Sequence, residues 1–206
     1  MTRRPLIFAL LLSSFPALAA SFGAFQITPR GDQKINLETG VTELPGGGTA
    51  VDSKTGLTLV ARSMRFKSGQ TLSAQGVTLR LKDGGALLAD TVTFDQRSGV
   101  LKASGHLSFT NAQISGLSAA GVQIYTHESA VVASGGVTAK TPALSARSVV
   151  VLDAGKKLLL SGPYTLKGKS SSYANTRADS HLLLSGDVAT NRPPASLLKP
   201  FAPYLK

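Results

Sequence analysis

Cysteine and tryptophan are both absent from this 206-residue sequence, and aromatic residues make up only 6% of it. The lack of cysteine excludes disulfide bonds, thiolate-ligated metal sites and attachment of a lipid to an N-terminal cysteine. Stability must therefore come from an apolar core or from the stacking of repeats. The scarcity of aromatic side chains argues against the stacking platforms that bind single-stranded nucleic acid, and we expect no nucleic-acid partner.

Long apolar runs are also missing, because no stretch after residue 20 reaches the roughly 20 residues that span a bilayer. At the N-terminus, Arg3 and Arg4 precede a short apolar run at 6–12 and a small-x-small site at 17–19. This order predicts a secretory signal peptide over residues 1–20, cleaved near Ala19 or Ala20. A retained membrane anchor is the alternative, but Pro16 interrupts the apolar run. We therefore expect an exported, soluble mature protein.

Acidic residues are few, with 11 aspartates and glutamates against 22 lysines and arginines. Removal of Arg3 and Arg4 leaves a net charge of +9. Basic exported proteins usually meet anions, such as nucleic acid, phospholipid head groups, acidic glycans or the phosphates of lipid A. The basic residues are scattered without an arginine-rich tract, so a solvated basic surface with no ligand is an equal alternative.

The sequence repeats itself through two short motifs. The first, A-x-x-[V/M]-x-[aromatic or β-branched], has four copies: ARSMRF at 61–66, ADTVTF at 89–94, AAGVQI at 119–124 and ARSVVV at 146–151. The second, apolar-x-[A/L]-x-G, has five: LSAQG at 72–76, LKASG at 101–105, VVASG at 131–135, LLLSG at 158–162 and LLLSG at 182–186. Both motifs keep nearly the same period, and this agreement indicates a tandem repeat.

Within the repeats, apolar and polar residues alternate with a period of two, as in strands with one buried face. Glycine-containing turn sequences separate these segments, for example at 67–69, 82–85, 97–99 and 153–155. We predict an all-β fold with the repeat domain at 57–190. Residues 21–56 hold N-terminal strands and an irregular part that a glycine-rich loop at 46–48 joins to the array, and residues 191–206 form a proline-rich tail that is an extended cap or a flexible end.

A single repeat of this size cannot bury its apolar face, whereas stacked neighbours can. Two arrangements fit: a β-solenoid around a closed core, or antiparallel strands folded into a V whose apolar faces look at each other. The length of the repeat, with turns on both sides, favours the V over the shorter coils of a solenoid. A V-shaped cross-section leaves a groove.

No catalytic constellation assembles in the sequence. His106, His127 and His181 lie in different repeats without metal-ligand spacing, and neither H-E-x-x-H nor G-x-S-x-G occurs. The run GPYTLKGKS at 162–170 resembles a phosphate-binding loop, but it has one residue too many between the glycines and no helix pattern after it. We expect no enzyme activity, no metal and no cofactor; a glycan-acting enzyme with a carboxylate pair is the remaining catalytic alternative.

The run GVTLRLKDGGALLADTVTFDQRSGVLKASGHLSF at 76–109 resembles the OstA/LptA-like repeat of lipopolysaccharide-transport proteins. In that family a G-x-V-x-L strand, a turn, L-x-A-D-x-V-x-[Y/F]-D and L-x-A-x-G-x-V follow one another in this order. The resemblance covers roughly residues 57–188. Later copies lose the aspartate after alanine, at Ala119-Ala120 and Ala146-Arg147, and no outer-membrane barrel sequence follows.

The resemblance implies an elongated open β-jelly roll, or β-taco, that holds acyl chains in an interior groove in the periplasm. It also implies partners: other β-jelly-roll transport proteins, or a second copy, joined through edge strands. Strand phase assigns the apolar inner face, and the rim residues Arg80 and Lys82 are expected to contact phosphorylated head groups. The predicted inner face comprises Val77, Leu79, Leu81, Val92, Phe94, Leu107, Phe109, Val122, Ile124, Val149 and Val151.

The sequence thus leads to the hypothesis of a carrier or bridge that binds a lipopolysaccharide-like glycolipid for transport to the outer membrane. The alternative is a structural or adhesive β-solenoid protein of the cell envelope that has no lipid ligand.

Overall fold

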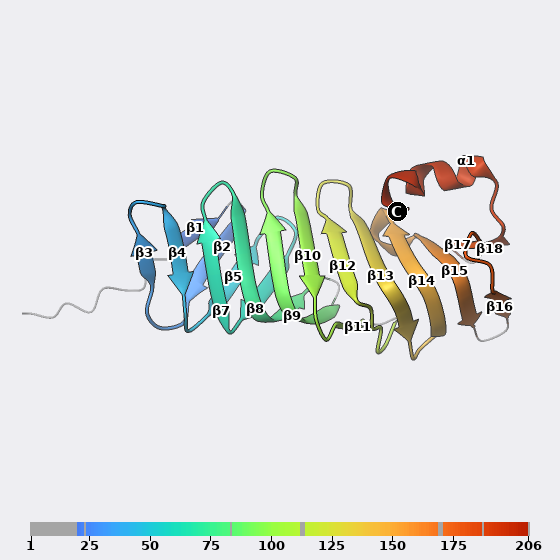
Figure 1. Cartoon of the computed structure of the whole chain (residues 1–206), viewed down its shortest axis with the longest axis horizontal. Coiled ribbons are helices and arrows are strands. Elements are labelled where there is room, and N and C mark those ends of the chain that lie inside the picture. Colours follow the sequence, from blue (N-terminus) through green and yellow to red (C-terminus); the bar gives the residue numbers. More distant parts are fainter. Residues whose placement is uncertain are drawn as a thin grey trace, which may run out of the picture.

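The computed structural model describes residues 20–22, 24–82, 84–111, 114–168, 171–186 and 188–205. The predicted signal peptide lies outside these residues, except for Ala20. The described residues form one open sheet of 18 strands, all paired antiparallel. Figure 1 shows these strands side by side along the long axis of the molecule. The prediction of an elongated, open, all-β fold is confirmed.

Most strands follow one another through short turns, and in the described part of the chain helical segments occur near the C-terminus and after β14. They are β1 (Ala20–Phe22), β2 (Phe25–Pro29), β3 (Lys34–Asn36), β4 (Val41–Leu44), β5 (Gly48–Asp52), β6 (Leu57–Ala61), β7 (Ser63–Lys67), β8 (Thr71–Arg80), β9 (Ala86–Asp95), β10 (Val100–Ser104), β11 (Ser108–Thr110), β12 (Gly121–Tyr125), β13 (Ala130–Ala139), β14 (Ala143–Leu152), β15 (Lys157–Lys167), β16 (Ser172–Asn175), β17 (His181–Ser185) and β18 (Val188–Asn191). The helical segments are η1 (Asp153–Gly155), α1 (Ala195–Leu198) and η2 (Lys199–Tyr204).

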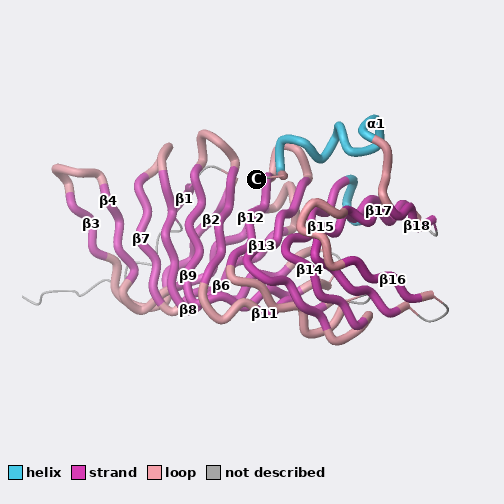
Figure 2. Tube along the Cα trace, turned by 45° about the vertical axis from the view of Figure 1, so that its right-hand side comes forward, coloured by secondary structure: helices cyan, strands magenta, loops and turns pink. Residues whose placement is uncertain are grey.

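The sheet is folded lengthwise into two walls. Wall 1 contains β3, β4, β7, β10, β12, β17 and β18, and wall 2 contains β1, β2, β5, β6, β11 and β16. The long strands β8, β9, β13, β14 and β15 run through both walls; residues 71–75 of β8, for example, pair with β7 in wall 1, and residues 78–80 pair with β6 in wall 2. The tube in Figure 2 shows how the long strands pass from one wall to the other. Each repeat therefore forms a hairpin in both walls.

The line along which the walls meet, here called the spine, interrupts the strand pairing. In β8 and β9 the pairs Gln75↔Thr91 and Val77↔Ala89 flank Gly76 and Asp90, which are left out of the ladder without a change of register. Bulges that shift the register by one residue occur in β13–β14 and β14–β15. In β8, β9 and β14 the alternation of side chains reverses at this line, which keeps the apolar face inside on both sides of the bend. The spine residues are Gly76, Asp90, Gly105, Ala120, Gly135, Arg147 and Gly162.

Steric crowding at the spine explains why the second sequence motif ends in glycine. A Cβ on Gly105 would lie 2.5 Å from Asp90 Oδ2, and a Cβ on Gly135 would collide with Ala120 Cβ. Both glycines also have positive φ, +73° and +80°. The spine residue of one strand thus occupies the space that a side chain on the next glycine needs.

The prediction that the fifth copy of the second motif, at 182–186, is equivalent to the other four is wrong. In the first four copies the chain runs from the turns to the spine, as in Leu158, Leu160 and Gly162 of β15. The copy at 182–186 runs the other way, since Leu182 pairs with Leu160 and Leu184 pairs with Leu158. Its glycine, Gly186, lies in the turn after β17.

The N-terminal part differs from the expected irregular segment, because β2, β3 and β4 belong to the same sheet. The glycines at 46–48, between β4 and β5, come close to the backbone after β2 and at the end of β6. A Cβ on Gly46 would collide with the carbonyl oxygen of Arg30, and one on Gly47 with that of Ala61. Here glycine permits two backbone segments to touch.

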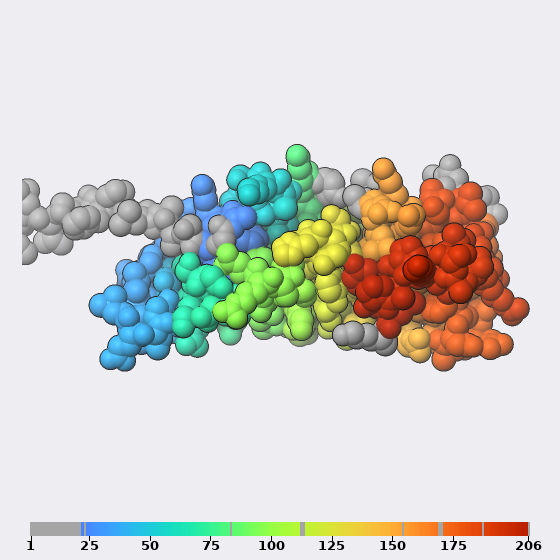
Figure 3. Space-filling model, turned by 90° about the horizontal axis from the view of Figure 1, so that it is seen from above, coloured from blue at the N-terminus to red at the C-terminus, as the bar shows by residue number. Residues whose placement is uncertain are grey.

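The C-terminal tail was expected to be an extended cap or a flexible end; its described residues do pack against the sheet, but they are helical and not extended. The C-terminal segment (193–205) forms α1 and η2 and packs on the outer surface of wall 1, where Phe201 is fully buried. In Figure 3 the red residues of this segment lie against the orange strands. The surface beneath it, here called the outer apolar patch, consists of Ala130, Val132, Val150, Leu152, Leu159 and Leu183.

Candidate functional site

The predicted inner-face residues lie together between the walls. All eleven belong to one hydrophobic cluster. Six of them are buried, namely Val77, Leu79, Val92, Leu107, Val122 and Val149. Five are partly buried and pack against that cluster, namely Leu81, Phe94, Phe109, Ile124 and Val151. The structure confirms a shared interior, and their role as ligand contacts stays a prediction.

The inner side chains of wall 1 form two cross-strand rows. The spine row lies deep and consists mostly of small or branched residues: Met64, Ala74, Val92, Ala103, Val122, Ala133, Val149, Leu160 and Leu182. The mouth row lies next to the turns: Phe66, Leu72, Phe94, Leu101, Ile124, Val131, Val151, Leu158 and Leu184. The mouth is the side of the molecule between the turns of wall 1 and those of wall 2.

The exposure of the mouth row changes along the molecule. Phe66, Leu72 and Leu101 are at most 5% exposed, and Phe94, between Leu72 and Leu101 in the row, is half-buried. From β12 to β17 every member of the row is half-buried, namely Ile124, Val131, Val151, Leu158 and Leu184. Apolar side chains in this second part therefore reach solvent in one continuous line.

Aromatic residues from β1 and β2 cover the first part of the mouth. The Phe22 ring lies 6.1 Å from that of Phe66 and 6.2 Å from that of Phe94, with both pairs in edge-to-face geometry. The Phe25 ring lies 5.6 Å from that of Phe94. Figure 3, seen from above, shows the blue N-terminal hairpin beside the cyan strands of wall 2. Wall 2 thus curls over toward wall 1 at its N-terminal end.

The turns of wall 2 carry exposed lysines, one in or beside each of four turns: Lys54, Lys82, Lys140 and Lys167. These four residues are here called the lysine rim. Asp52 at the same rim is buried, and its carboxylate accepts hydrogen bonds from Lys54 N and the Thr55 hydroxyl at 2.9 and 2.8 Å. Among the described residues of these turns, the exposed ionisable side chains are therefore all basic. Asp83, in the second turn, lies outside the described residues.

The predicted head-group residues Arg80 and Lys82 are both exposed at this rim. Lys82 packs its aliphatic stem over Gly56 in the neighbouring turn, since a Cβ there would lie 2.9 Å from Lys82 Cβ. This contact holds the aliphatic part of the Lys82 side chain against the turn, while its ammonium group stays in solvent. Arg80 pairs with Thr58 and points away from the interior.

The rim of wall 1 has mixed charge. Its turns contain Glu38, Asp95, Arg97, Glu128 and Asp153. The backbone N–H groups of Ser98 and Arg97 both donate to Asp95 Oδ1 at 2.9 Å. These bonds, that of Ser98 first, lower the pKa of Asp95 and keep it ionised. The two rims therefore differ, and wall 2 supplies the cationic side.

Sequence reasoning missed two shallow hollows on the outer surface of wall 1. The larger, about 440 Å³, is lined by Thr93, Lys102, Gln123 and Tyr125, among others. The smaller lies beside it over β7, with Arg65 and Lys67. Alternating polar residues on these strands were a visible signal, but the same alternation is expected of any solvated face. Of the predicted site residues, only Phe94 lines either hollow.

Among the described residues, the hydrogen bond that most resembles a catalytic nucleophile–base pair joins Ser161 Oγ and His181 Nδ1, at 3.1 Å. Ser161 is only 1% exposed, so this hydroxyl cannot meet a substrate. Burial, together with the positive charge of Arg147, lowers the pKa of His181. The pair is best explained as a polar tie between β15 and β17.

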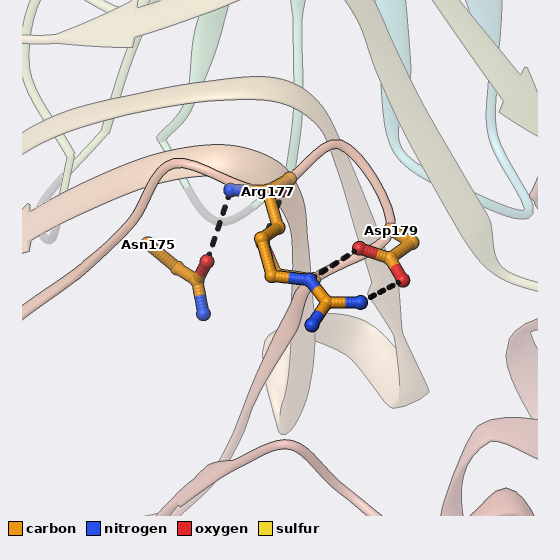
Figure 4. A network of polar contacts seen from close by, with 4 residues as sticks. Asn175, Arg177 and Asp179 are labelled. Carbon is orange, nitrogen blue, oxygen red and sulfur yellow. Dashed lines mark hydrogen bonds and ion pairs between the residues drawn. The ribbon is translucent and has the colours of Figure 1, made fainter.

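Neighbouring polar residues close the corner between β16 and β17. Figure 4 shows Asp179 accepting two hydrogen bonds from the Arg177 guanidinium, at 3.0 and 2.8 Å, while Arg177 N donates to Asn175 Oδ1. Gly162 N donates to Ser180 O at 2.8 Å, which fixes this corner against the spine. The ion pair is exposed and serves to shape the loop.

Two absences concern the described residues only. They contain no cluster of three histidine, aspartate or glutamate side chains that could hold a metal ion. No helix among them is long and apolar enough to cross a membrane. Residues 162–167 of the phosphate-loop-like run lie in β15, while Lys169 and Ser170 lie outside the described residues.

Both ends of the sheet leave strands with one neighbour only in the described chain. These are β1 and β3 at one end, and β16 and β18 at the other. Ile35 on β3 is 57% exposed, and Val188 on β18 is 65% exposed. Unpaired edges with exposed apolar residues are suited to strand addition.

No protein-family model matches this chain, and no curated protein matches it at a significant level. The similarity of residues 76–109 to the OstA/LptA-like repeat therefore stays a prediction from the sequence.

Proposed function

We propose that this protein is a non-enzymatic periplasmic carrier that holds the acyl chains of an anionic, lipopolysaccharide-like glycolipid between its walls on the way to the outer membrane. The observation that carries the proposal is the half-buried part of the mouth row, from Ile124 to Leu184. Covering such apolar surface is favourable by about 25 cal/mol per Å². An acyl chain laid along the row would cover it continuously.

The lysine rim supports an anionic head group. Its members occupy equivalent turns of the repeat, and Asn111 stands at the one turn between Lys82 and Lys140 that lacks a lysine. Neighbouring hairpins in a sheet lie about 10 Å apart, because each adds two strands at about 4.8 Å. Lys54 and Lys82 are thus about 10 Å apart along the sheet, as are Lys140 and Lys167, with about 20 Å between the two pairs. Cations in such a row beside an apolar mouth complement a lipid that carries several negative charges.

The free edges support end-to-end partners, either a second copy of the chain or another β-jelly-roll protein. Ile35 on β3 and Val188 on β18 would be covered by such pairing. Sedimentation at increasing protein concentration tests self-association. We expect Ile35→Lys to reduce it, and Leu88→Lys, on the exposed outer surface of wall 2, to leave it unchanged.

A structural envelope protein without a ligand is the second candidate. The closed N-terminal end favours it, since Leu59, Leu79 and Phe22 are at most 1% exposed, as in an ordinary core. A β-solenoid, however, stacks parallel coils, whereas every pairing here is antiparallel. The solenoid form of this alternative is therefore wrong, and the choice that remains is between a lipid-binding and a purely structural β-jelly roll.

Photo-crosslinking separates these two functions. We place p-benzoylphenylalanine at Ile124, on the inner side of β12, and at its neighbour Gln123, on the outer side. The purified protein is irradiated with lipopolysaccharide micelles. We expect a lipid adduct at Ile124 and none at Gln123. The same experiment is made with the crosslinker at Val151 and at Leu158. Absence of an adduct at all three inner positions would favour the purely structural function.

Charge reversal tests the head-group contact. We expect Lys82→Glu combined with Lys140→Glu to weaken lipopolysaccharide binding several-fold at low salt and to matter less at high salt, because screening removes the difference. Lys102→Glu on the outer face of wall 1 is the matched control. An uncharged monoacylglycerol probe should bind all three proteins alike.

A further inference from the structure

The mouth row has the same direction and apolar chemistry along the whole of wall 1, yet its exposure differs. Three of its four members on β7–β10 are at most 5% exposed, whereas all five members from β12 to β17 are half-buried. Leu72 on β8 and Val151 on β14 occupy equivalent positions, one residue row from the turns. Leu72 is 2% exposed, whereas Val151 is half-buried. The difference arises from what covers the row and not from the row itself.

The N-terminal hairpin of β1 and β2 covers Phe66 and Phe94, which flank Leu72 in the mouth row. Phe22 is fully buried and Phe25 is 5% exposed, although both lie near one end of the molecule. Their rings touch Phe66 and Phe94 of the mouth row in three edge-to-face contacts. Such aromatic pairs contribute about 0.5–1.5 kcal/mol each beyond the burial of apolar area. Contacts with wall 1 therefore help to hold the β1–β2 hairpin in place.

No equivalent element covers the described mouth row from Ile124 to Leu184. The C-terminal segment packs on the opposite, outer side of these strands, where Phe201 meets Val150 and Leu159. Side chains alternate across a strand, so a residue that covers Val150 cannot cover Val151. The two terminal segments therefore act on different faces of wall 1.

We infer that Phe22 and Phe25 are specificity-determining residues that close the groove over β7–β10, so that an acyl-chain ligand enters sideways between β12 and β17. This inference rests on the proposed function. It gives the site a defined length, because acyl chains can extend along the half-buried row only as far as the Phe22–Phe94 contact. A groove closed at this end does not pass lipid out through β3 and β4.

Closure itself can be measured without a ligand, because the chain contains no cysteine. We compare the labelling rates of single-cysteine variants Leu72→Cys and Val151→Cys with a small maleimide. We expect fast labelling at Val151 and protection at Leu72. Adding Phe22→Ala should raise the rate at Leu72 at least tenfold and leave Val151 unchanged. Comparable rates at the two positions in the parent protein would overturn closure.

The ligand boundary is then tested with p-benzoylphenylalanine at Leu72 or Val151 and lipopolysaccharide micelles as the probe. We expect adducts only at Val151 in the parent protein, and at both positions when Phe22→Ala is added. Phe22→Leu keeps apolar bulk and should give an intermediate yield, which covers the case in which the alanine variant unfolds. Leu37→Ala, at a residue 91% exposed at the same end, is the control.

The outcomes separate the two proposals. Equal adducts at Leu72 and Val151 in the parent protein would overturn the boundary and leave the carrier function intact. Adducts at Val151 alone, even in folded Phe22→Ala and Phe22→Leu, would show that the phenylalanine ring is not the boundary. Absence of adducts at every inner position would overturn the carrier function, and the boundary with it.

Discussion

The hydroxyl of Tyr164 donates a 2.8 Å hydrogen bond to Asn191 Oδ1 and so joins the two walls at the C-terminal end of the sheet. Tyr164 lies in the wall 2 part of β15, and Asn191 is the last residue of β18 in wall 1. The tyrosine is 1% exposed, whereas the asparagine is exposed. The bond therefore connects a buried donor to a solvent-facing acceptor.

This asymmetry predicts unequal effects of removing either partner. Tyr164→Phe leaves Asn191 free to bond to water and should cost about 1 kcal/mol, whereas Asn191→Ala strands a buried hydroxyl and should cost about 1–3 kcal/mol. Urea denaturation of both variants and of the double variant measures the difference. A larger loss from Tyr164→Phe than from Asn191→Ala would contradict this asymmetry, because it would mean that the hydroxyl contributes to stability without Asn191 as its acceptor.

The contact between Gly135 and Ala120 at the spine predicts a coupled pair of substitutions. Gly135→Ala places a methyl group against Ala120 Cβ and should cost more than the about 1–2 kcal/mol of a left-handed residue with a side chain. Gly136→Ala is the matched control, since its φ is +82° and nothing lies within 4 Å of its Cβ position. Adding Ala120→Gly should recover the excess loss of Gly135→Ala, measured as a double-mutant cycle. Independent, additive effects would contradict the steric account.

Much of the fold could be predicted from the period of the sequence. Alternation at Val77 and Leu79, and again at Val92 and Phe94, indicates which side of each strand faces inward, and the structure places these residues in one interior. One period of the first motif, from Ala61 to Ala89, matches one hairpin in each wall. Periodicity succeeds here because burial of one face is what selects the side chains.

Strand direction could not be predicted in the same way. The pattern apolar-x-apolar reads alike in both directions, so the segment at 182–184 matched a motif whose strand runs oppositely. The shortened spacing between the copies at 158–162 and 182–186 was the only sign of this difference. The outer apolar patch had a clearer signal, because runs such as Val149–Leu152 lack alternation altogether and indicate strands covered on both faces.

The closure by Phe22 left no signal in the sequence. A single aromatic residue beside a predicted cleavage site has no period, and its partners Phe66 and Phe94 belong to distant strands, β7 and β9. Only the curl of wall 2 brings these rings together. The lysine rim could have been found, since its members follow the repeat, but lysine at a turn is also what solubility alone would select.

The C-terminal segment should stabilise the sheet through Phe201. This ring is fully buried against the outer apolar patch, so Phe201→Ala should cost about 3–5 kcal/mol. Leu197, 45% exposed on α1, is the matched control, and Leu197→Ala should stay within about 0.5 kcal/mol of the parent. Chemical denaturation gives both values. We also expect Phe201→Ala to self-associate in sedimentation, because the patch becomes accessible; a monomeric variant of unchanged stability would contradict this packing.

The last prediction concerns protonation at the spine. His106 Nδ1 lies 2.6 Å from Asp90 Oδ2, and this hydrogen bond, aided by the negative charge, raises the pKa of His106 above its ordinary value of 6.5. A raised pKa in the folded state means that the favourable contribution is fully present below pH 6.5 and disappears as the pH rises through the folded pKa. Both side chains are exposed, so the ion pair contributes little to stability. The change in the pKa of His106 should therefore be measured by titration and not by thermal unfolding.

An NMR titration of the histidine ring protons measures this directly. We expect the midpoint of His106 above 6.5 and that of His181 below it, since burial lowers the pKa of His181. Asp90→Asn should return the His106 midpoint to about its ordinary value and leave His181 unchanged, because Asp90 lies on β9 and His181 on β17. A His106 midpoint that does not respond to Asp90→Asn would show that the pair does not form in solution, and Gly105 would then be constrained by its backbone conformation alone.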